Sequence, residues 1–334
     1  KALAHARLVN EREAYQTASQ DRLGDALLVG ESAAMRTLKA QLEKAAQSEV
    51  TVLLYGESGT GKEVAARVLH RAGPRRHRPF LGVNCAALSA ALLESELFGH
   101  EKGAFTGADR ARQGRFELAS GGTLLLDEVT EMEERLQAKL LRVLQERTYE
   151  RVGSSRTMRA DARVVATSNR DLEAAVRDGR LRQDLYYRLN VLSIRIPPLR
   201  ERLEDVPELC RHFLKRAGRG RTLGLAPEAL ARLQAYAYPG NVRELENLIE
   251  RAAVLAEGDL LGSEHFPLST GSTAPDAGLR LGAPRTLEEA ERALITSTLE
   301  RFQGHRRKTA EALGIAERTL RDKLSRYGQE MASR

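Results

Sequence analysis

The sequence predicts an α/β fold in which a parallel sheet lies between layers of helices, followed by segments that are entirely helical. Short apolar runs indicate strands at residues 51–55, 80–84, 123–127 and 163–167, and each run is followed by a polar loop or a helix. Strands that alternate with helices in this way are typical of a parallel sheet covered on both faces. After Pro197 and Pro198 the strand-like runs stop, so we expect an α-helical lid there.

The length and composition indicate a globular protein with more than one domain. The 334 residues are too many for one compact core, and the chain is 42% hydrophobic and 30% charged, as globular proteins are. No apolar run approaches the ~20 residues that span a membrane, and no signal peptide opens the sequence, so we expect a cytoplasmic protein without membrane contact. The two cysteines, Cys85 and Cys210, form no C-x-x-C pair, which argues against a disulfide framework or a zinc site. The net charge of +7 is compatible with a polyanionic partner.

A glycine-rich segment predicts a nucleotide site. Residues 56–62 follow the first strand-like run and precede a predicted helix at residues 63–70, which is the context of a phosphate-binding loop. Backbone N–H groups and the helix N-terminus would bind phosphate oxygens, and Lys62 would place its charge near the β- and γ-phosphates. Position 63 is Glu where the general motif has a Ser or Thr that ligates Mg²⁺, so the metal would depend more on other carboxylates and on water. The residues expected to bind nucleotide are Gly56, Glu57, Ser58, Gly59, Thr60, Gly61, Lys62, Glu63 and Arg243.

Two acidic residues end the third strand-like run. Asp127 and Glu128 follow the apolar segment Thr123-Leu124-Leu125-Leu126, and carboxylates at the C-terminal end of a parallel strand face the ligand crevice. We expect Asp127 to hold Mg²⁺, directly or through water, and Glu128 to polarise the attacking water. The alternative is an acidic pair that complements a helix dipole, and the nearby phosphate loop favours the catalytic interpretation.

A second glycine-containing segment predicts a mobile loop with a protein partner. Gly103 and Gly107 flank Phe105 and Thr106, and glycine permits the positive φ angles that such loops need. Exposing a phenylalanine to water is unfavourable, so a loop that presents one usually has a partner. The alternative is a Phe packed into the chain's own core. Residues 151–159 are either an accessory loop or an ordinary surface hairpin.

The C-terminal residues predict a helix-turn-helix. Leu287, Ala290, Leu294, Ile295 and Phe302 form a helical apolar stripe, and Gly314 separates two short helices. Residues 304–327 contain seven basic and three acidic side chains, which is consistent with DNA binding. We expect Leu320, Leu324 and Tyr327 to be buried. The expected DNA contacts are Arg306, Arg307, Arg318, Thr319, Arg321, Ser325 and Arg326.

Residues 93–108 (LESELFGHEKGAFTGA) closely resemble those of bacterial enhancer-binding proteins, the AAA+ activators of sigma-54 RNA polymerase. This family also shares the Gly-Lys-Glu of residues 61–63. The resemblance implies an AAA+ P-loop ATPase with a helical lid and a C-terminal Fis-type DNA-binding domain, in which position 309 is Thr where Ala is usual. It also implies ATP and Mg²⁺ as ligands, and a ring of six or seven subunits that rests as a dimer. The residues it implies for contact with sigma-54 are Gly103, Ala104, Phe105, Thr106, Gly107 and Ala108.

The same resemblance implies accessory roles for five polar residues. Asn84 would restrain the catalytic Glu until a partner is sensed, Asn169 would orient water near the γ-phosphate, and Arg243 would report nucleotide state from the lid. Arg182 and Arg188 would reach the ATP site of a neighbouring subunit. Simpler roles stay open: the asparagines as ordinary polar residues at strand ends, the arginines as solvated side chains, and a helix-capping pair formed near Arg243 by Asn241 and Glu244.

The predicted domains are a helical linker (residues 1–22), the AAA+ domain (residues 23–266), a flexible linker (residues 267–285) and the DNA-binding domain (residues 286–334). Within the AAA+ domain, the α/β core is expected at residues 23–196 and the lid at residues 197–266. Residues 1–22 resemble the segment after a receiver domain, so we expect the output part of a two-component response regulator without its regulatory domain. The predicted function is ATP-driven conversion of the sigma-54 polymerase closed complex to an open complex at enhancer DNA. The alternatives are a DNA-binding regulator with a passive nucleotide switch, and a DNA-remodelling ring ATPase.

Overall fold

The computed structural model describes residues 27–218, 223–256, 258–268, 295–296, 298–299, 302, 305–313 and 315–332. The chain divides into two compact units, residues 1–270 and 271–334, and each is described by itself. The expected linker at residues 1–22 lies outside the described residues, as do residues 269–285 of the linker expected at 267–285, Leu287, Ala290 and Leu294, and the side chain of Tyr327. Residues 267 and 268 are described, and the buried Leu268 belongs to the core of the lid instead.

The larger unit is built on a five-stranded parallel sheet with the strand order β2-β5-β8-β1-β9. The strands are β1 (Val52–Tyr55), β2 (Phe80–Asn84), β5 (Thr123–Asp127), β8 (Arg163–Ser168) and β9 (Leu192–Arg195). The four predicted strands are confirmed. The edge strand β9 was not predicted: its apolar residues alternate with Ser193 and Arg195, unlike the more continuous apolar runs of the four predicted strands, and Ile194 is its only buried residue.

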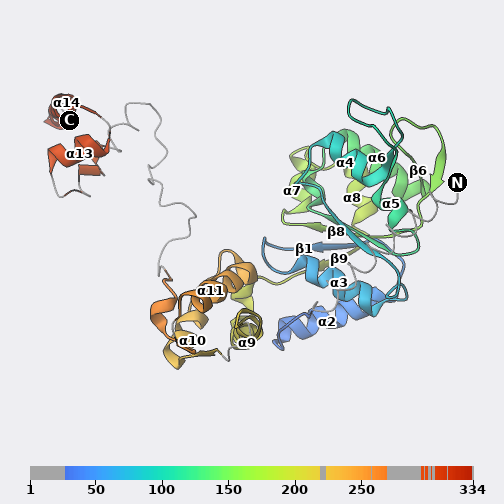
Figure 1. Ribbon diagram of the computed structural model, residues 1–334, viewed down its shortest axis with the longest axis horizontal. Helices are drawn as coiled ribbons and strands as arrows, with labels where there is room; N and C mark the ends of the chain where they lie inside the picture. The colour runs from blue at the N-terminus through green and yellow to red at the C-terminus, as the bar shows by residue number, and fades with distance from the viewer. Residues whose placement is uncertain are drawn as a thin grey trace. The chain divides into compact units, whose positions relative to one another are not determined.

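Helices cover both faces of this sheet, as predicted (Figure 1). One face packs against α2 (Ala33–Ala46) and α3 (Lys62–Ala72), and its core includes Val52 and Leu54. The opposite face, which includes Leu53, packs against α4, α6 and α8. The helices on that side are α4 (Ala90–Phe98), α5 (Arg115–Leu118), α6 (Glu134–Glu146), α7 (Leu172–Arg177) and α8 (Gln183–Leu189).

Two short antiparallel pairs carry loops at the periphery of the α/β core. The pair β3 (Gly99–His100) and β4 (Arg112–Gln113) encloses the glycine-flanked loop, and the pair β6 (Thr148–Glu150) and β7 (Thr157–Arg159) forms a hairpin. His100 also bridges to Val152, so the bases of the two loops lie side by side.

The segment after Pro198 forms a helical lid with its own core. Its helices are α9 (Val206–Ala217), α10 (Pro227–Gln234) and α11 (Asn241–Leu255), and Tyr238 and Phe266 are fully buried among them. Single 3₁₀ turns, η1 (Val129–Glu131), η2 (Leu199–Glu201), η3 (Leu203–Asp205) and η4 (Ser263–His265), complete the unit. The expectation that strands stop after Pro198 is wrong in one detail, since β10 (Gly224–Leu225) pairs with β11 (Leu260–Leu261). Two-residue strands are too short to leave a periodic signal.

The smaller unit contains α13 (Arg306–Ala312) and α14 (Glu317–Ala332), joined by a short turn. Ile295, Ala310 and Leu320 form its buried centre, and Leu324 packs against them. Thr309 is also fully buried, and its hydroxyl donates to the carbonyl of His305 at 2.9 Å. This bond explains how a hydroxyl is accommodated where the resembled pattern has Ala. Within the described residues, no helix is long and apolar enough to cross a membrane.

Candidate functional site

The phosphate loop connects β1 to α3, and its glycines are required by backbone geometry. Gly59 and Gly61 have φ angles of 76° and 100°, which side chains with a Cβ rarely adopt. A Cβ on Gly59 would also lie 2.3 Å from the carbonyl oxygen of Gly240, in the lid. The loop is therefore shaped both to expose its N–H groups and to let the lid approach closely.

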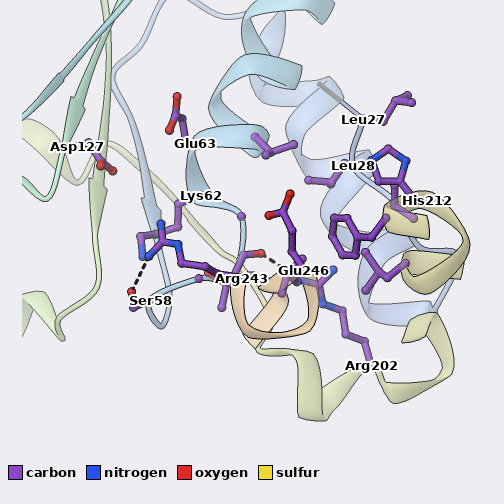
Figure 2. Close-up of a pocket in the computed structure, with 18 of the residues that line it drawn as sticks. Leu27, Leu28, Ser58, Lys62, Glu63, Asp127, Arg202, His212, Arg243 and Glu246 are labelled. Carbon is purple, nitrogen blue, oxygen red and sulfur yellow. Dashed lines mark hydrogen bonds between the residues drawn. The ribbon is translucent and has the colours of Figure 1, made fainter. Parts of the chain in front are cut away.

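A cavity of about 430 Å³ lies between the α/β core and the lid (Figure 2). Phosphate-loop residues from Ser58 to Val64, together with Asn84, Asp127 and Glu128, form its polar part. The apolar part is lined by Leu27, Leu28, Val29, Leu209 and Phe213. One polar and one apolar end fit a molecule that carries phosphates on a flat ring system.

Lys62 is held at the centre of the polar part. Its side chain is only 7% exposed, and Nζ donates to the carbonyls of Gly56 at 2.9 Å and Glu57 at 3.1 Å. Nζ also lies 3.9 Å from Glu128 Oε1. Burial lowers the pKa of Lys62, and the charges of Glu128 and Asp127 act in the opposite direction.

One hydroxyl holds both acidic residues of the strand end. Thr167, on the neighbouring strand β8, donates to Asp127 Oδ1 at 2.5 Å and accepts from the backbone N–H of Glu128 at 3.0 Å. Glu128 has a φ of 55°, a left-handed conformation that turns its side chain away from the strand direction. Its Oε2 accepts from the backbone N–H of Asn169 at 3.1 Å. Burial raises the pKa of the Glu128 carboxyl.

The donor set at this strand end fits Mg²⁺. Asp127 presents its carboxylate to the cavity beside Glu128, and no group of three or more His, Cys, Asp or Glu residues gathers anywhere in the described part of the chain. Mg²⁺ is usually held by one or two carboxylates together with substrate phosphates and water, rather than by a cage of protein ligands. Asp127 is the residue that would hold it here.

Three of the predicted site residues have contacts that differ from the prediction. Asn84 Nδ2 donates to Asp127 Oδ2 at 3.2 Å rather than to Glu128, because Asn84 and Asp127 are register partners on adjacent strands. The exposed side chain of Asn169 borders a separate cavity, and only its N–H contacts Glu128. Glu63 lines the nucleotide cavity, but its side chain is 57% exposed and pairs with Arg67 one turn along α3, at 2.6 Å.

Two further residues of the motif do not line the nucleotide cavity. Gly56 and Glu57 border the separate cavity beside Asn169. The Glu57 carboxylate turns away because Arg200 and Asn241 donate hydrogen bonds to it on the other side of the loop. Its predicted nucleotide contact is therefore not formed by the side chain.

The three predicted arginines occupy two different places. Arg243, on α11, lies at the cavity, and Nη1 is 3.4 Å from Ser58 Oγ (Figure 2). Arg182 and Arg188 lie outside it: Arg182 pairs with Asp184 at 2.8 Å, and Arg188 donates to the carbonyl of Leu144 at 2.9 Å. Neither side chain therefore contacts the nucleotide cavity of this chain.

The glycine-flanked loop presents its aromatic residue to solvent. Gly103 and Gly107 have φ angles of 82° and 95°, and Phe105 is 42% exposed, so the alternative of a Phe buried in the core is excluded. The Phe105 ring makes an edge contact with His100, with 5.0 Å between ring centroids. Thr106 is exposed beside it.

The β6–β7 hairpin packs directly against this loop. Arg151 Nη1 donates to Glu101 at 2.9 Å, and Nη2 donates to Glu117 at 2.7 Å. A Cβ on Gly153 would lie 2.8 Å from the Cβ of Ala104. These contacts favour an accessory loop over an independent surface hairpin.

In the smaller unit, the expected DNA contacts are exposed where they are described. Arg306 and Arg307 lie on α13, and Arg318, Thr319 and Arg321 lie on the first turns of α14. The side chains of Ser325 and Arg326 lie outside the described residues. Leu320 is buried as expected.

Sequence reasoning missed several residues that organise the site. Thr167 could have been found as a polar residue near the end of an apolar strand, two residues before Asn169. Asn241 was read only as part of a capping pair, but its side chain contacts the phosphate loop, and Glu244 alone accepts from Gly240 N–H at 2.7 Å. Arg202 is 3% exposed and donates to the carbonyl of Thr60 at 3.1 Å, a long-range contact that no local pattern shows.

The fold and the site define a P-loop ATPase of the AAA+ class, and comparison with known proteins defines the family. The Sigma-54 interaction domain matches residues 28–195, the AAA+ ATPase lid domain residues 200–280, and the Fis family of bacterial regulatory proteins residues 286–327. The chain belongs to the family of sigma-54-dependent transcriptional activators. It is therefore an ATP-binding, ATP-hydrolysing regulator of transcription.

Known relatives are similar over nearly the whole chain. The transcriptional regulatory protein ZraR of Klebsiella oxytoca is 49% identical over 330 residues, which is 98% of this chain and 73% of the relative. The regulatory protein AtoC of Escherichia coli K12 is 48% identical over 311 residues, 90% of this chain and 68% of the relative. The crystal structure of NtrX from Brucella abortus in complex with ADP has a TM-score of 0.70 and 33% identity, covering 98% of this chain and 75% of NtrX. The same protein in complex with ATP has a TM-score of 0.69 and 32% identity.

The role of the Thr167 hydroxyl can be tested by an isosteric substitution. Thr167→Val removes the donor to Asp127 and the acceptor of the Glu128 N–H, so ATP turnover should fall by roughly 10- to 100-fold. Thr167→Ser keeps the hydroxyl and should retain most of the activity. Steady-state phosphate release measures both variants, with thermal unfolding as a check on folding. Parental turnover in the Val variant would show that this hydroxyl does not organise the site.

Proposed function

We propose that this activator uses ATP hydrolysis in a subunit ring to move the loop Gly103–Ala108 against sigma-54, and so converts the closed promoter complex to the open complex. The observation that carries the proposal is a continuous path from the nucleotide cavity to that loop. Asn84 contacts Asp127 and also accepts from the N–H groups of Ala86 and Ala87, just before α4.

The second half of this path runs from α4 to the loop. Ser95, on α4, hydrogen bonds to Nδ1 of the buried His100 at 2.7 Å, and His100 Nε2 hydrogen bonds to the carbonyl of Arg110, just before β4. The His100 ring then contacts Phe105. A shift of Asp127 can therefore reach Phe105 through packed, hydrogen-bonded groups.

In the hydrolysis step, Lys62 neutralises charge on the β- and γ-phosphates and Glu128 polarises the attacking water. The raised pKa of Glu128 matches a group that takes up a proton in the transition state. Mg²⁺, when bound, supplies further neutralisation of phosphate charge, and Asp127 is placed to hold it. Arg243 contacts the phosphate loop from the lid and orients the nucleotide.

The placement of the arginines supports the proposed ring. Arg182 and Arg188 lie outside the chain's own cavity, so we assign them to the ATP site of the adjacent subunit. An arginine delivered in this way is worth ~10³–10⁵ in rate. A hexamer or a heptamer satisfies this requirement, and a dimer is the resting form.

The DNA-binding domain, residues 286–334, places the ring on enhancer DNA. Arg318 and Arg321 on α14 contact base edges or phosphates, and α13 supplies Arg306 and Arg307. Residues 23–266 form the AAA+ part. By analogy with the family, the chain is the output part of a two-component response regulator.

If Arg188 acts in the ATP site of a neighbouring subunit, two inactive variants should restore activity when their subunits are mixed. Arg188→Ala should bind ATP and lose turnover, and Glu128→Gln should do the same. Mixed rings should recover activity, because some interfaces combine an intact Glu128 with an intact Arg188. Phosphate release from mixtures at several ratios measures this recovery. Additive residual activities with no recovery, or turnover independent of protein concentration, would contradict action between subunits.

Thr106→Ala separates hydrolysis from promoter opening. Thr106 is exposed at the loop and lies outside the nucleotide cavity, so ATP turnover should stay within about twofold of the parent while open-complex formation is lost. Permanganate reactivity of a sigma-54 promoter measures opening. Thr37→Ala, at an exposed site on α2, is the matched control and should behave as the parent. Normal opening by the Thr106 variant would refute the role of the loop.

A further inference from the structure

Glu57 belongs to the phosphate-loop motif, but its side chain faces away from the nucleotide cavity. Arg200, in η2, donates to both carboxylate oxygens at 2.5 and 2.7 Å, and Asn241 Nδ2 donates to Oε2 at 3.2 Å. The bidentate contact with Arg200 lowers the pKa of Glu57 to about 2. We call Glu57, Arg200 and Asn241 the Glu57 junction.

Asn241 connects this junction to the lid. It is the first residue of α11, is fully buried and has a φ of 54°, an uncommon conformation that its surroundings must fix. Its Nδ2 also donates to the carbonyl of Ser58 at 3.0 Å, and its Oδ1 accepts from the N–H of Leu199 at 2.8 Å. Every hydrogen bond that the side chain makes here leads to the phosphate loop or to η2.

The backbone extends the same contact along the loop. The N–H of Arg243 donates to the carbonyl of Gly59 at 3.2 Å, and Gly59 packs against the Gly240 carbonyl with no room for a Cβ. Three consecutive loop residues, from Glu57 to Gly59, therefore contact the start of α11. Arg243 is two residues beyond Asn241 on this helix, so the junction holds the backbone from which the Arg243 side chain extends.

We propose that Glu57 is a positioning residue: through Arg200 and Asn241 it fixes the start of α11 on the phosphate loop and so sets Arg243 over the bound nucleotide. The inference rests on the proposed role of Arg243. Glu57 then contributes to ATP turnover without contacting phosphate or metal. The sequence motif alone does not distinguish this positioning role from direct contact with the nucleotide.

Because the Glu57–Arg200 ion pair is partly exposed, we expect its loss to change the rate of ATP turnover more than the stability of the fold. Glu57 and Arg200 are 43% and 45% exposed, and a pair of this kind contributes little to global stability. A small displacement of a group over the reacting phosphates, in contrast, can cost up to about 10²-fold in rate. Loss of the junction should therefore lower kcat with little change in the unfolding temperature.

A double-mutant cycle between Glu57 and Arg243 tests the proposal. Glu57→Ala and Arg243→Ala should each lower kcat by roughly 10-fold or more, and the double variant should be no slower than Arg243→Ala. Binding of a fluorescent ATP analogue to Glu57→Ala should stay within a few-fold of the parent. Multiplicative losses in the double variant, or loss of nucleotide binding by Glu57→Ala, would overturn the proposal.

Arg200→Ala repeats the test without changing the phosphate loop, and it should copy the kinetic defect of Glu57→Ala. Arg142→Ala is the control, because Arg142 also forms an exposed ion pair, with Glu146 on α6, and that pair includes no residue of the phosphate loop or η2. It should retain parental kinetics. Equal defects in the two arginine variants would overturn the proposal. Parental turnover by Arg243→Ala would instead refute the role proposed for Arg243, and this inference with it.

Discussion

The ATPase unit depends on holding one buried lysine and two carboxylates together at the edge of a parallel sheet. Burying the Lys62 ammonium would carry a large desolvation cost, which the negative charges of Glu128 and Asp127 offset in part. The two carboxylates repel each other, so both depend on Lys62 and on their hydrogen bonds. The parallel strands bring them together, since β1 leads into the phosphate loop and β5 ends at Asp127. Thr167 on the strand between them fixes both acids with one hydroxyl. The relative positions of these three side chains therefore depend on the order of the strands in the sheet.

Two other segments, the loop Gly103–Ala108 and the lid, are connected to the groups at this end of the sheet. Asp127 contacts Asn84, from which α4 and His100 lead to Phe105. On the other side, the phosphate loop contacts the lid through Asn241. Both connections begin at groups that line or border the same cavity. The proposed function uses this arrangement: one hydrolysis event would act on both the loop Gly103–Ala108 and the lid.

The sequence was sufficient for the fold class, the phosphate loop and the acidic strand end, because these depend on local patterns: apolar runs, glycines and paired acids. It was also sufficient for the exposed Phe105, through the flanking glycines and the family resemblance. It was insufficient for contacts between distant segments. Asn84 was expected beside Glu128, but register on the sheet pairs it with Asp127. Glu57 was expected at the nucleotide, and only the folded chain shows that Arg200 and Asn241 draw its carboxylate away.

The central claim is that the nucleotide state controls the loop Gly103–Ala108. The most direct measurement is the affinity of the chain for fluorescently labelled sigma-54 without nucleotide, with ADP, and with ADP plus aluminium fluoride, an analogue of the hydrolysis transition state. The account predicts stable binding only with the analogue, and loss of that binding when Phe105 is replaced by Ala. Equal sigma-54 affinity in all three states would contradict it.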